Sequence, residues 1–370
     1  MKEKHYFSTE GLTVGYDGVP VIKNIDICLN RGEILTLIGP NGAGKTTILK
    51  SIIRQLTPIS GTVYLDEKQL KKMSGKELST RMSVVLTERI KPELMSCEDV
   101  VATGRYPYTG AFGLLSDSDR KIVRESMEMV HILELADRDF TRISDGQKQR
   151  VMLARAICQE PDIIVLDEPT SFLDIKYKLE FLSIIQNMSR KHNLSVIMSL
   201  HELDLAGRIS DKILCVKGDK VDRFGTPEEV FTRGYIPQLY GMTAGSYDEL
   251  TGNLELNPVT GDPKVFVLAG NGTGTSVFRR LQREGVPFAA GILWENDLDY
   301  PSAEALAVNV ISVKAFAEME KNTGEEARKM IDNCEKVICT LDVSQWGQMG
   351  DYGRELKMLL EYAGTQGKLD

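Results

Sequence analysis

The sequence predicts two α/β domains in series, and three observations lead to that fold class. Between residues 33 and 200, apolar strand-like runs alternate with amphipathic helix-like runs, a pattern typical of a mostly parallel sheet with helices on both faces. Near residue 241 the composition changes to a stretch rich in Gly, Asn, Asp and Pro. Strand and helix runs then start again at residue 264. A chain of 370 residues is long enough to bury a core in each domain.

Periodicity and turn residues place the elements of the first domain. Residues 13–30 contain short alternating stretches around GYDGVP, which predicts strands joined by a turn. Residues 61–67 are predicted to form an edge strand, and residues 91–142, with helical stretches such as 118–135, a helical insert. The other predictions are strands at 33–38, 162–168 and 194–200 and helices at 46–54 and 176–192.

A second, smaller α/β domain is predicted after the change in composition. Its predicted elements are strands at 264–269, 287–293, 308–313 and 336–341 and helices at 275–285 and 325–335. The expected organisation is a first domain at 1–245 with a helical subdomain at about 91–150, a linker region at 246–263, and a Rossmann-like domain of unknown role at 264–370.

Composition narrows the class of protein. The formal net charge of −8 disfavours a nucleic-acid partner, because such proteins usually present a basic face. No segment approaches the roughly 18 consecutive apolar residues that span a bilayer, and the first residues lack the apolar core of a signal peptide, so we expect a cytoplasmic protein. The six cysteines are expected to be small buried hydrophobes: Cys28, Cys97, Cys158, Cys215, Cys334 and Cys339.

A glycine-rich loop carries the strongest functional signal. Residues 39–46 match G-x-x-x-x-G-K-[ST] between a predicted strand and a predicted helix. A triphosphate needs several backbone N–H groups that point inward, and glycine lets the chain curl that closely. Lys45 is expected to reach the β and γ phosphates, and the Thr46 hydroxyl to ligate Mg²⁺. The predicted nucleotide-binding residues are Gly39, Pro40, Asn41, Gly42, Ala43, Gly44, Lys45, Thr46 and Thr47.

Two acids follow the second apolar strand in the sequence IIVLDEP. Asp167 lies where a carboxylate holds Mg²⁺ through water, and Glu168 follows it directly. A glutamate at that place can polarise the attacking water as a general base. Paired acids are common at ordinary helix starts, so this signal gains its strength from the phosphate loop.

Together these motifs resemble the ATP-binding subunits of ABC transporters over about residues 5–240. Besides the phosphate loop and the acid pair, ISDGQKQR is similar to the LSGGQ signature, SFLD to the D-loop, and SLHELD to the switch segment with His201. Tyr16 in VGYDG matches the aromatic residue that stacks on adenine. The resemblance implies a P-loop NTPase cassette with a RecA-like core, an antiparallel β subdomain and a helical subdomain.

The resemblance also implies a mechanism that needs two cassettes. They would pair head to tail, so that the signature of one meets the ATP of the other, most simply in a homodimer. Glu168 and His201 would be catalytic, and Asp174 would link the two sites across the dimer. The signature residues expected to bind the partner's ATP are Ser144, Asp145, Gly146 and Gln147.

Two positions depart from the family pattern. The signature has Asp145 where glycine is usual, so its carboxylate must point away from phosphate while the backbone amides remain usable. Alignment of RMSVVLTER with the Q-loop puts Glu88 where glutamine is usual. Glutamate can still ligate Mg²⁺ but lacks the amide donor. The expected metal-binding residues are therefore Thr46, Glu88 and Asp167.

Within the family, GRYPYTG at residues 104–110 and FGTPEEVF at 224–231 resemble segments of importers of iron–siderophore, haem or vitamin B12 complexes. The resemblance implies an ATPase on the cytoplasmic face of the cell membrane. Its partners would be a separate integral membrane permease and, indirectly, a substrate-binding protein, with no nucleic acid. ATP and Mg²⁺ are the expected cofactors.

Alternative functions remain open at this point. One is an ABC ATPase without a transport role, acting in translation, on DNA or in cluster assembly. Ribosome-type members usually carry two cassettes in one chain and DNA-repair types carry long coiled-coil inserts, whereas this chain has one phosphate loop and no extended heptad run. A further alternative is an enzymatic C-terminal domain, but no triad or metal cluster supports it.

The C-terminal domain contains a second glycine-rich turn. Gly270, Gly272 and Gly274 lie between a predicted strand and helix, loosely like a dinucleotide fingerprint whose spacing would require the third glycine at Thr275. Glu295 ends the next strand region, where an acid can bind a ribose. Binding of a nucleotide and a purely structural turn are both open, the structural turn being favoured.

Overall fold

The computed structural model describes residues 5–86, 94–110, 113–171, 173–320, 322–342 and 350–370. The chain divides into two compact units, Met1–Tyr240 and Gly241–Asp370. The division falls at the start of the Gly-, Asn- and Asp-rich stretch. Within the described residues, no helix has both the length and the apolar character needed to cross a membrane.

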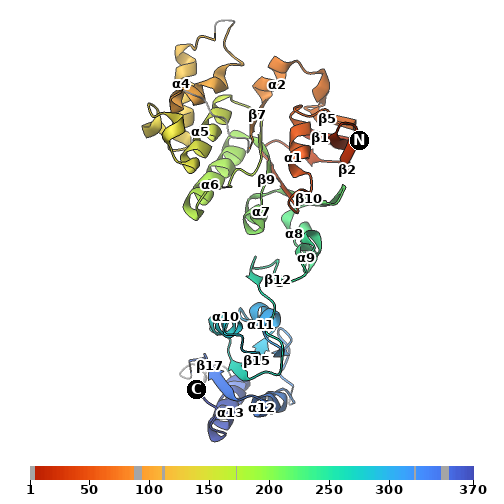
Figure 1. Ribbon diagram of the computed structural model, residues 1–370, viewed down its shortest axis with the longest axis vertical. Helices are drawn as coiled ribbons and strands as arrows, with labels where there is room; N and C mark the ends of the chain where they lie inside the picture. The colour runs from red at the N-terminus through yellow and green to blue at the C-terminus, as the bar shows by residue number, and fades with distance from the viewer. Residues whose placement is uncertain (1–4, 87–93, 111–112, 172, 321, 343–349) are drawn as a thin grey trace. The chain divides into compact units, whose positions relative to one another are not determined.

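One sheet of 11 strands, counted over the described residues, forms the centre of the N-terminal unit (Figure 1). Its order is β6-β5-β1-β2-β11-β10-β4-β9-β8-β7, with β3 paired to β1. The strands are β1 (Phe7–Tyr16), β2 (Val19–Ile25), β3 (Cys28–Leu29), β4 (Ile34–Ile38), β5 (Ser60–Leu65), β6 (Lys68–Gln69), β7 (Met82–Val85), β8 (Ile163–Leu166), β9 (Ser195–Ser199), β10 (Lys212–Lys217) and β11 (Lys220–Gly225).

The sheet is mixed: β11 pairs parallel with β2 on one side and antiparallel with β10 on the other. Strands β1, β2, β5 and β6 pair antiparallel, whereas β10, β4, β9, β8 and β7 are parallel neighbours. Every residue of β4, β8 and β9 is buried, as expected for strands covered on both faces. The prediction of an edge strand at 61–67 is wrong in one respect, because β6 pairs with the outer side of β5.

Helices cover the parallel part of the sheet and form the helical subdomain. They are α1 (Lys45–Ile52), α2 (Gly75–Arg81), α3 (Cys97–Ala102), α4 (Asp117–Met129), α5 (Asp145–Cys158), α6 (Ile175–His192), α7 (Leu203–Ile209), α8 (Pro227–Val230) and α9 (Tyr235–Tyr240), with a 3-10 turn η2 (Thr103–Arg105) after α3. Helices α3, α4 and α5 pack on one another, and each begins at a serine with a capping box. The helix expected to reach residue 135 ends at Met129, since His131 has a φ of 55°.

The C-terminal unit is a separate four-stranded parallel sheet within the described residues. Its order is β16-β15-β14-β17, so the first strand lies inside the sheet, as in doubly wound α/β folds. Its elements are β14 (Val265–Leu268), α10 (Thr275–Arg283), β15 (Phe288–Trp294), α11 (Tyr300–Leu306), β16 (Asn309–Val313), α12 (Thr323–Asn333), β17 (Lys336–Cys339) and α13 (Gly350–Thr365), preceded by the short pair β12 (Ser246–Tyr247) and β13 (Leu254–Glu255).

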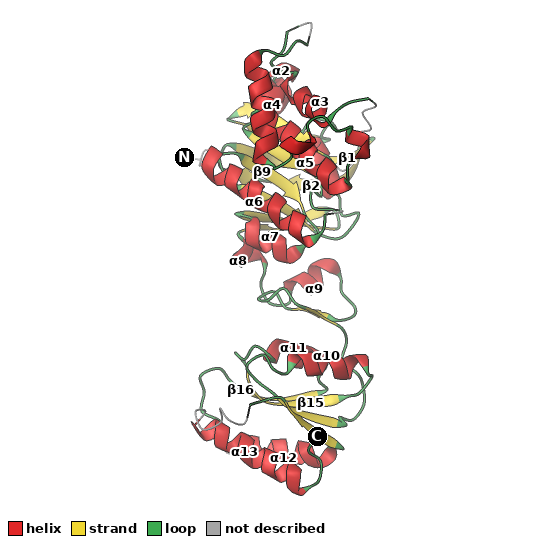
Figure 2. Cartoon of the chain, turned by 90° about the vertical axis from the view of Figure 1, so that its left-hand side faces the viewer, coloured by secondary structure: helices red, strands yellow, loops and turns green. Residues whose placement is uncertain are grey.

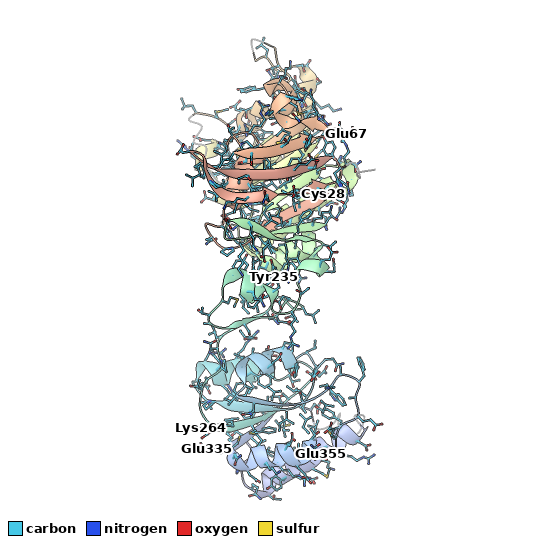
Figure 3. The ribbon with its side chains drawn as sticks, turned by 90° about the vertical axis from the view of Figure 1, so that its right-hand side faces the viewer. Cys28, Glu67, Tyr235, Lys264, Glu335 and Glu355 are labelled. Carbon is cyan, nitrogen blue, oxygen red and sulfur yellow. The ribbon has the colours of Figure 1, made fainter. Side chains whose placement is uncertain are left out.

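Two apolar layers hold this unit together, one on each face of the sheet. Helices α10 and α11 cover one face, and α12 and α13 cover the other (Figure 2). At the amino ends of β14 and β17, Lys264 and Glu335 lie together, and the Glu335 N–H donates to the Lys264 carbonyl over 2.7 Å (Figure 3).

The cysteines follow the prediction in part. Cys97, Cys158, Cys215 and Cys334 are buried, whereas Cys28 and Cys339 are partly exposed; all six are free thiols. Burial raises the pKa of the Cys97, Cys158, Cys215 and Cys334 thiols to about 11. A thiol with a raised pKa is a poor nucleophile at neutral pH, so these four residues act as packing groups.

Phe278 tests the α10 layer. Its ring is fully buried and stacks on Phe288 with ring centroids 5.3 Å apart. We expect Phe278→Ala to destabilise the C-terminal unit by about 3–5 kcal/mol. Both tryptophans of the chain lie beyond residue 240, so urea unfolding followed by tryptophan fluorescence reports on this unit. The control Phe316→Ala removes a ring that is 95% exposed and should change the midpoint little; equal effects of the two changes would contradict this packing.

Candidate active site

The glycine-rich loop leaves β4 and enters α1, as predicted. Gly39 has a φ of 145°, and a Cβ there would lie 2.3 Å from the Val216 carbonyl oxygen, so the loop packs where a larger residue cannot. Gly42 and Gly44 also have positive φ values, and the Ala43 N–H donates to the Pro40 carbonyl over 3.2 Å. No side chain caps α1 and no acid occupies its first turn, so the positive end of the helix faces the loop.

Lys45 lies inside the loop and is 5% exposed. Its ammonium donates to the Gly39 carbonyl over 2.7 Å and to the Pro40 carbonyl over 3.1 Å. Burial lowers the pKa of Lys45, while Glu168 and Asp167 oppose that shift. Lys45 is thus a buried cation near two carboxylates, at the amino-terminal end of α1.

Asp167 joins three elements at the carboxyl edge of the sheet. It follows β8 and is 3% exposed. It accepts hydrogen bonds from the Thr46 hydroxyl over 3.0 Å and from the Ser199 hydroxyl over 2.7 Å. The carboxylate and hydroxyl oxygens of Asp167 and Thr46 are a donor set that suits Mg²⁺, which prefers hard oxygen ligands.

Glu168 and His201 form a close pair next to that carboxylate. His201 Nε2 and Glu168 Oε1 are 2.6 Å apart, and the Ser171 hydroxyl donates to the other carboxylate oxygen over 3.3 Å. Glu168 has a φ of 47°, and its N–H donates to the Ser199 hydroxyl over 2.9 Å. The contacts hold the carboxylate in one orientation at the surface of the site.

Tyr16 and Thr47 lie close to each other beside the phosphate loop. The Tyr16 ring is 47% exposed at the end of β1, and its hydroxyl lies 3.4 Å from Thr47 Oγ1. A half-exposed ring beside the phosphate loop has a face available for stacking. The Tyr240 hydroxyl also contacts the loop, because it accepts a hydrogen bond from the Gly39 N–H over 3.3 Å.

The signature residues form the first turn of α5. Ser144 is the N-cap, and its hydroxyl accepts from the Gln147 N–H over 3.3 Å while the Gln147 side chain accepts from the Ser144 N–H over 3.0 Å. The Asp145 carboxylate pairs with Lys148 at 3.5 Å. A Cβ on Gly146 would lie 3.3 Å from the Leu173 side chain, so little room exists there. The turn is exposed at Ser144 and Asp145.

Two other predicted residues have different outcomes. Asp174 is exposed and caps α6, accepting from the Tyr177 N–H over 3.0 Å. Glu88, the predicted Q-loop residue, lies outside the described residues.

Sequence reasoning missed three contributors to the site. Ser199 bridges Asp167 and the Glu168 backbone, and its only sequence signal is a serine at the end of the apolar run SVIMS. No sequence pattern predicts the contact of Tyr240 with the loop. Glu202, next to His201, accepts from Thr170 over 3.0 Å and from Lys178, and these hydrogen bonds lower its pKa although burial opposes the shift.

Comparison with known proteins agrees with this arrangement. Residues 22–171 match the ABC transporter family. An uncharacterized ABC transporter ATP-binding protein of Methanocaldococcus jannaschii is 44% identical over 287 residues, covering 77% of this chain and 99% of the relative. The chain belongs to the family of ABC transporter ATP-binding proteins. Members of that family are ATPases, so this ABC protein is an ATPase, and the importer interpretation is favoured over an ABC ATPase without a transport role.

Two further relatives are named for import. The iron(3+)-hydroxamate import ATP-binding protein of Bacillus subtilis is 35% identical over 237 residues, covering 64% of this chain and 88% of the relative. The cobalamin import ATP-binding protein of Halobacterium salinarum is 30% identical over 326 residues, covering 86% of this chain and 81% of the relative. A solved metal-chelate type ABC transporter in an inward-facing conformation has a TM-score of 0.58 and 26% identity, covering 68% of this chain and 96% of that one.

The second glycine-rich turn has a different chemistry from the first. Asp299, which is fully buried, accepts from the N–H groups of Gly274 and Thr275 over 2.9 and 2.8 Å. Asp297 accepts from the Asn271 N–H through both carboxylate oxygens, at 3.0 and 2.8 Å. These are the amides that a pyrophosphate would need, so the geometry favours a structural turn over dinucleotide binding. Residues 288–368 match the MJ0874 family.

Glu168→Gln tests the proposed general base. The amide keeps the shape of the side chain but takes up no proton, so hydrolysis should fall by about 100- to 10,000-fold. ATP binding should persist. Phosphate release and ATP titration on the purified chain measure the two effects separately. The exposed control Glu134→Gln should behave as the parent; a Glu168→Gln chain with unchanged turnover would remove Glu168 from this role.

Ser199→Ala tests the residue that sequence reasoning missed. Loss of the hydroxyl removes one donor to Asp167 and the acceptor of the Glu168 N–H, which costs about 1–3 kcal/mol for the unpaired groups. We expect turnover to fall about tenfold or more. Ser195→Ala is the matched control, because Ser195 is buried on the same strand but bonds to Asn30 instead. If both changes had the same effect on turnover, Ser199 would have only a packing role.

Proposed function

We propose that this ABC ATPase powers uptake of a metal chelate of the cobalamin type through a separate membrane permease. The constellation of Lys45, Thr46, Asp167, Glu168 and His201 supports the ATPase part. The proposed substrate class depends on how much of this chain each relative matches. The match to the cobalamin import protein is longer than the 240-residue cassette and therefore includes part of the C-terminal unit, whereas the hydroxamate import protein matches only 237 residues.

In the proposed mechanism the chain binds the triphosphate of ATP at the loop. The inward amides and the Lys45 ammonium bind phosphate oxygens, and Tyr16 stacks on the adenine. Thr46 and Asp167 would hold Mg²⁺, since their oxygens suit it and lie 3.0 Å apart; Glu88 would be a further ligand. When bound, Mg²⁺ neutralises charge on the phosphates. Thr47 would be a further contact to the nucleotide, since it follows Thr46 in the first turn of α1.

Hydrolysis then depends on residues at the outer side of the site. Glu168 takes the proton of the attacking water, and His201 holds Glu168 and contacts the γ-phosphate. Ser144, with the amides of Asp145 and Gly146, binds the ATP of a second cassette through the positive end of α5. Asp145 pairs with Lys148 and so stays clear of the phosphate. Asp174 connects the two sites across the dimer.

This mechanism requires partners on the cytoplasmic face of a membrane. ATP joins two copies of the chain and hydrolysis releases them, which gives a two-state motor. A permease supplies the membrane pathway, and a substrate-binding protein delivers the chelate to it. Nucleic acid has no part in the proposed function.

Co-purification tests this proposal. The tagged chain, extracted from native membranes in mild detergent, should bring down a polytopic permease in roughly stoichiometric amount. Added cobalamin should then raise ATP turnover of the complex reconstituted with its substrate-binding protein, and a ferric hydroxamate should not. Recovery of ribosomes, nucleic acid or assembly factors alone would contradict the transport role. Stimulation by the ferric hydroxamate alone would support the importer role but overturn the assignment of cobalamin as the substrate.

A further inference from the structure

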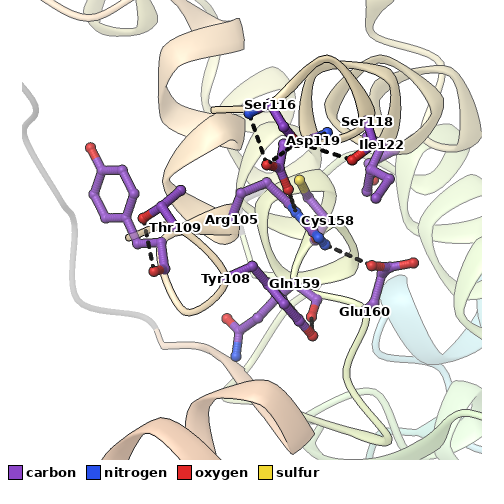
Figure 4. Close-up of polar contacts among 12 residues, drawn as sticks. Arg105, Tyr108, Thr109, Ser116, Ser118, Asp119, Ile122, Cys158, Gln159 and Glu160 are labelled. Carbon is purple, nitrogen blue, oxygen red and sulfur yellow. Dashed lines mark hydrogen bonds and ion pairs between the residues drawn. The ribbon is translucent and has the colours of Figure 1, made fainter. Parts of the chain in front are cut away.

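Arg105 is a buried cation at the base of the segment 103–109. It lies in η2 and is 5% exposed. Its guanidinium donates to the Asp119 carboxylate over 2.9 Å, to the Cys158 carbonyl over 2.8 Å and to the Glu160 carboxylate over 2.7 Å (Figure 4). One side chain therefore joins η2, the start of α4 and the end of α5.

The backbone around Arg105 also lies against α5. A Cβ on Gly104 would be 2.3 Å from the Arg155 carbonyl oxygen and 3.3 Å from the Cys158 Cβ, so only glycine permits this approach. The Arg155 side chain donates to the Thr103 hydroxyl over 2.8 Å. Contacts on three consecutive residues thus fix the segment to the last turns of α5.

Tyr108 extends the same contact to the neighbouring part of the cassette. Its ring lies 4.0 Å from the Arg105 guanidinium, and its hydroxyl donates to the Gln159 carbonyl over 2.8 Å. The Gln159 amide in turn donates to the carbonyls of Ser79 and Met82, which join α2 to β7. Tyr106 and Tyr108 remain 59% and 40% exposed, so the segment also presents an aromatic surface.

The contacts of Arg105 lie at the carboxyl end of α5, and the signature lies at its amino end. The helix begins at Ser144, where the capping box forms, and ends at Cys158, whose carbonyl binds Arg105. Its 14 residues make a rod about 20 Å long. An unbroken helix is a rigid element that can carry a displacement of its first turn to its last turn.

We propose that Arg105 is a positioning residue that binds the segment 103–109 to α5, so that nucleotide contact at Ser144 changes the surface carried by Tyr106 and Tyr108. This inference rests on the proposed function, in which Ser144 binds ATP of a second cassette. The Asp119 and Glu160 carboxylates take part in this coupling, because a buried guanidinium keeps its position only while its charge partners remain. Asp119 is itself fixed by the Ser116 hydroxyl and N–H.

Hydrogen exchange on the full-length chain carrying Glu168→Gln tests this coupling between Ser144 and the segment 103–109. In that parent, Mg–ATP should slow exchange of residues 39–47 at the nucleotide and also slow exchange of residues 103–109, by about fivefold or more. With Asp119→Asn or Glu160→Gln added, the slowing at 103–109 should fall below about twofold, while that at 39–47 stays as in the parent. A role in folding alone would instead lower protection with and without ATP alike.

Glu125→Gln is the matched control on α4, because its exposed carboxylate pairs only with Lys121 at 3.6 Å among the contacts described; it should respond as the parent does. An unchanged ATP response at 103–109 in both Asp119→Asn and Glu160→Gln would overturn the inference, and so would no response there in the parent. Absence of protection at 39–47 in the parent would overturn the proposed ATPase function and this inference with it.

Discussion

The shared Asp167 carboxylate is the interaction on which the active site depends. Strands β4, β9 and β8 are adjacent and parallel, so Ser199 and Asp167 lie at one edge of the sheet, where the loop after β4 also brings Thr46. A carboxylate that is 3% exposed needs hydrogen-bond donors, and the two hydroxyls supply them. Ser199 then orients the Glu168 backbone, and Glu168 contacts His201. The metal-binding oxygens and the proposed base are therefore positioned by one buried network.

The two glycine-rich turns of the chain show how similar sequences lead to opposite electrostatics. At α1 the helix start carries no side-chain cap and no acid in its first turn, and the Lys45 ammonium lies inside the loop that precedes it. At α10 the same kind of helix start is neutralised by Asp299 from the loop before α11. An anion is attracted to the first helix and meets an existing carboxylate at the second. Local sequence alone does not decide whether a glycine-rich turn binds phosphate.

The distinction between local sequence and tertiary contacts also explains which features of the fold and the site the sequence predicts. The phosphate loop, the acid pair and the buried strands are encoded within short windows, and the structure places them as expected. Asp299 lies 24 residues beyond Thr275 and Ser199 lies 32 residues beyond Asp167, so their roles depend on tertiary contacts that periodicity does not report. Helix α13 was not predicted either, although its buried residues, such as Leu356 and Leu359, complete one apolar layer. Strand β6 is only two residues long and gave no periodic signal.

The helix starts at Ser144 and Asp174 connect these local rules to the need for a second chain. Each residue uses its side chain to cap its own helix, through the Gln147 N–H and the Tyr177 N–H respectively. The Ser144 hydroxyl accepts one hydrogen bond and keeps its own proton to donate. Both residues are exposed. The helix start at Ser144 can bind an anion only when another molecule presents one, which is the physical reason that a dimer completes the proposed site.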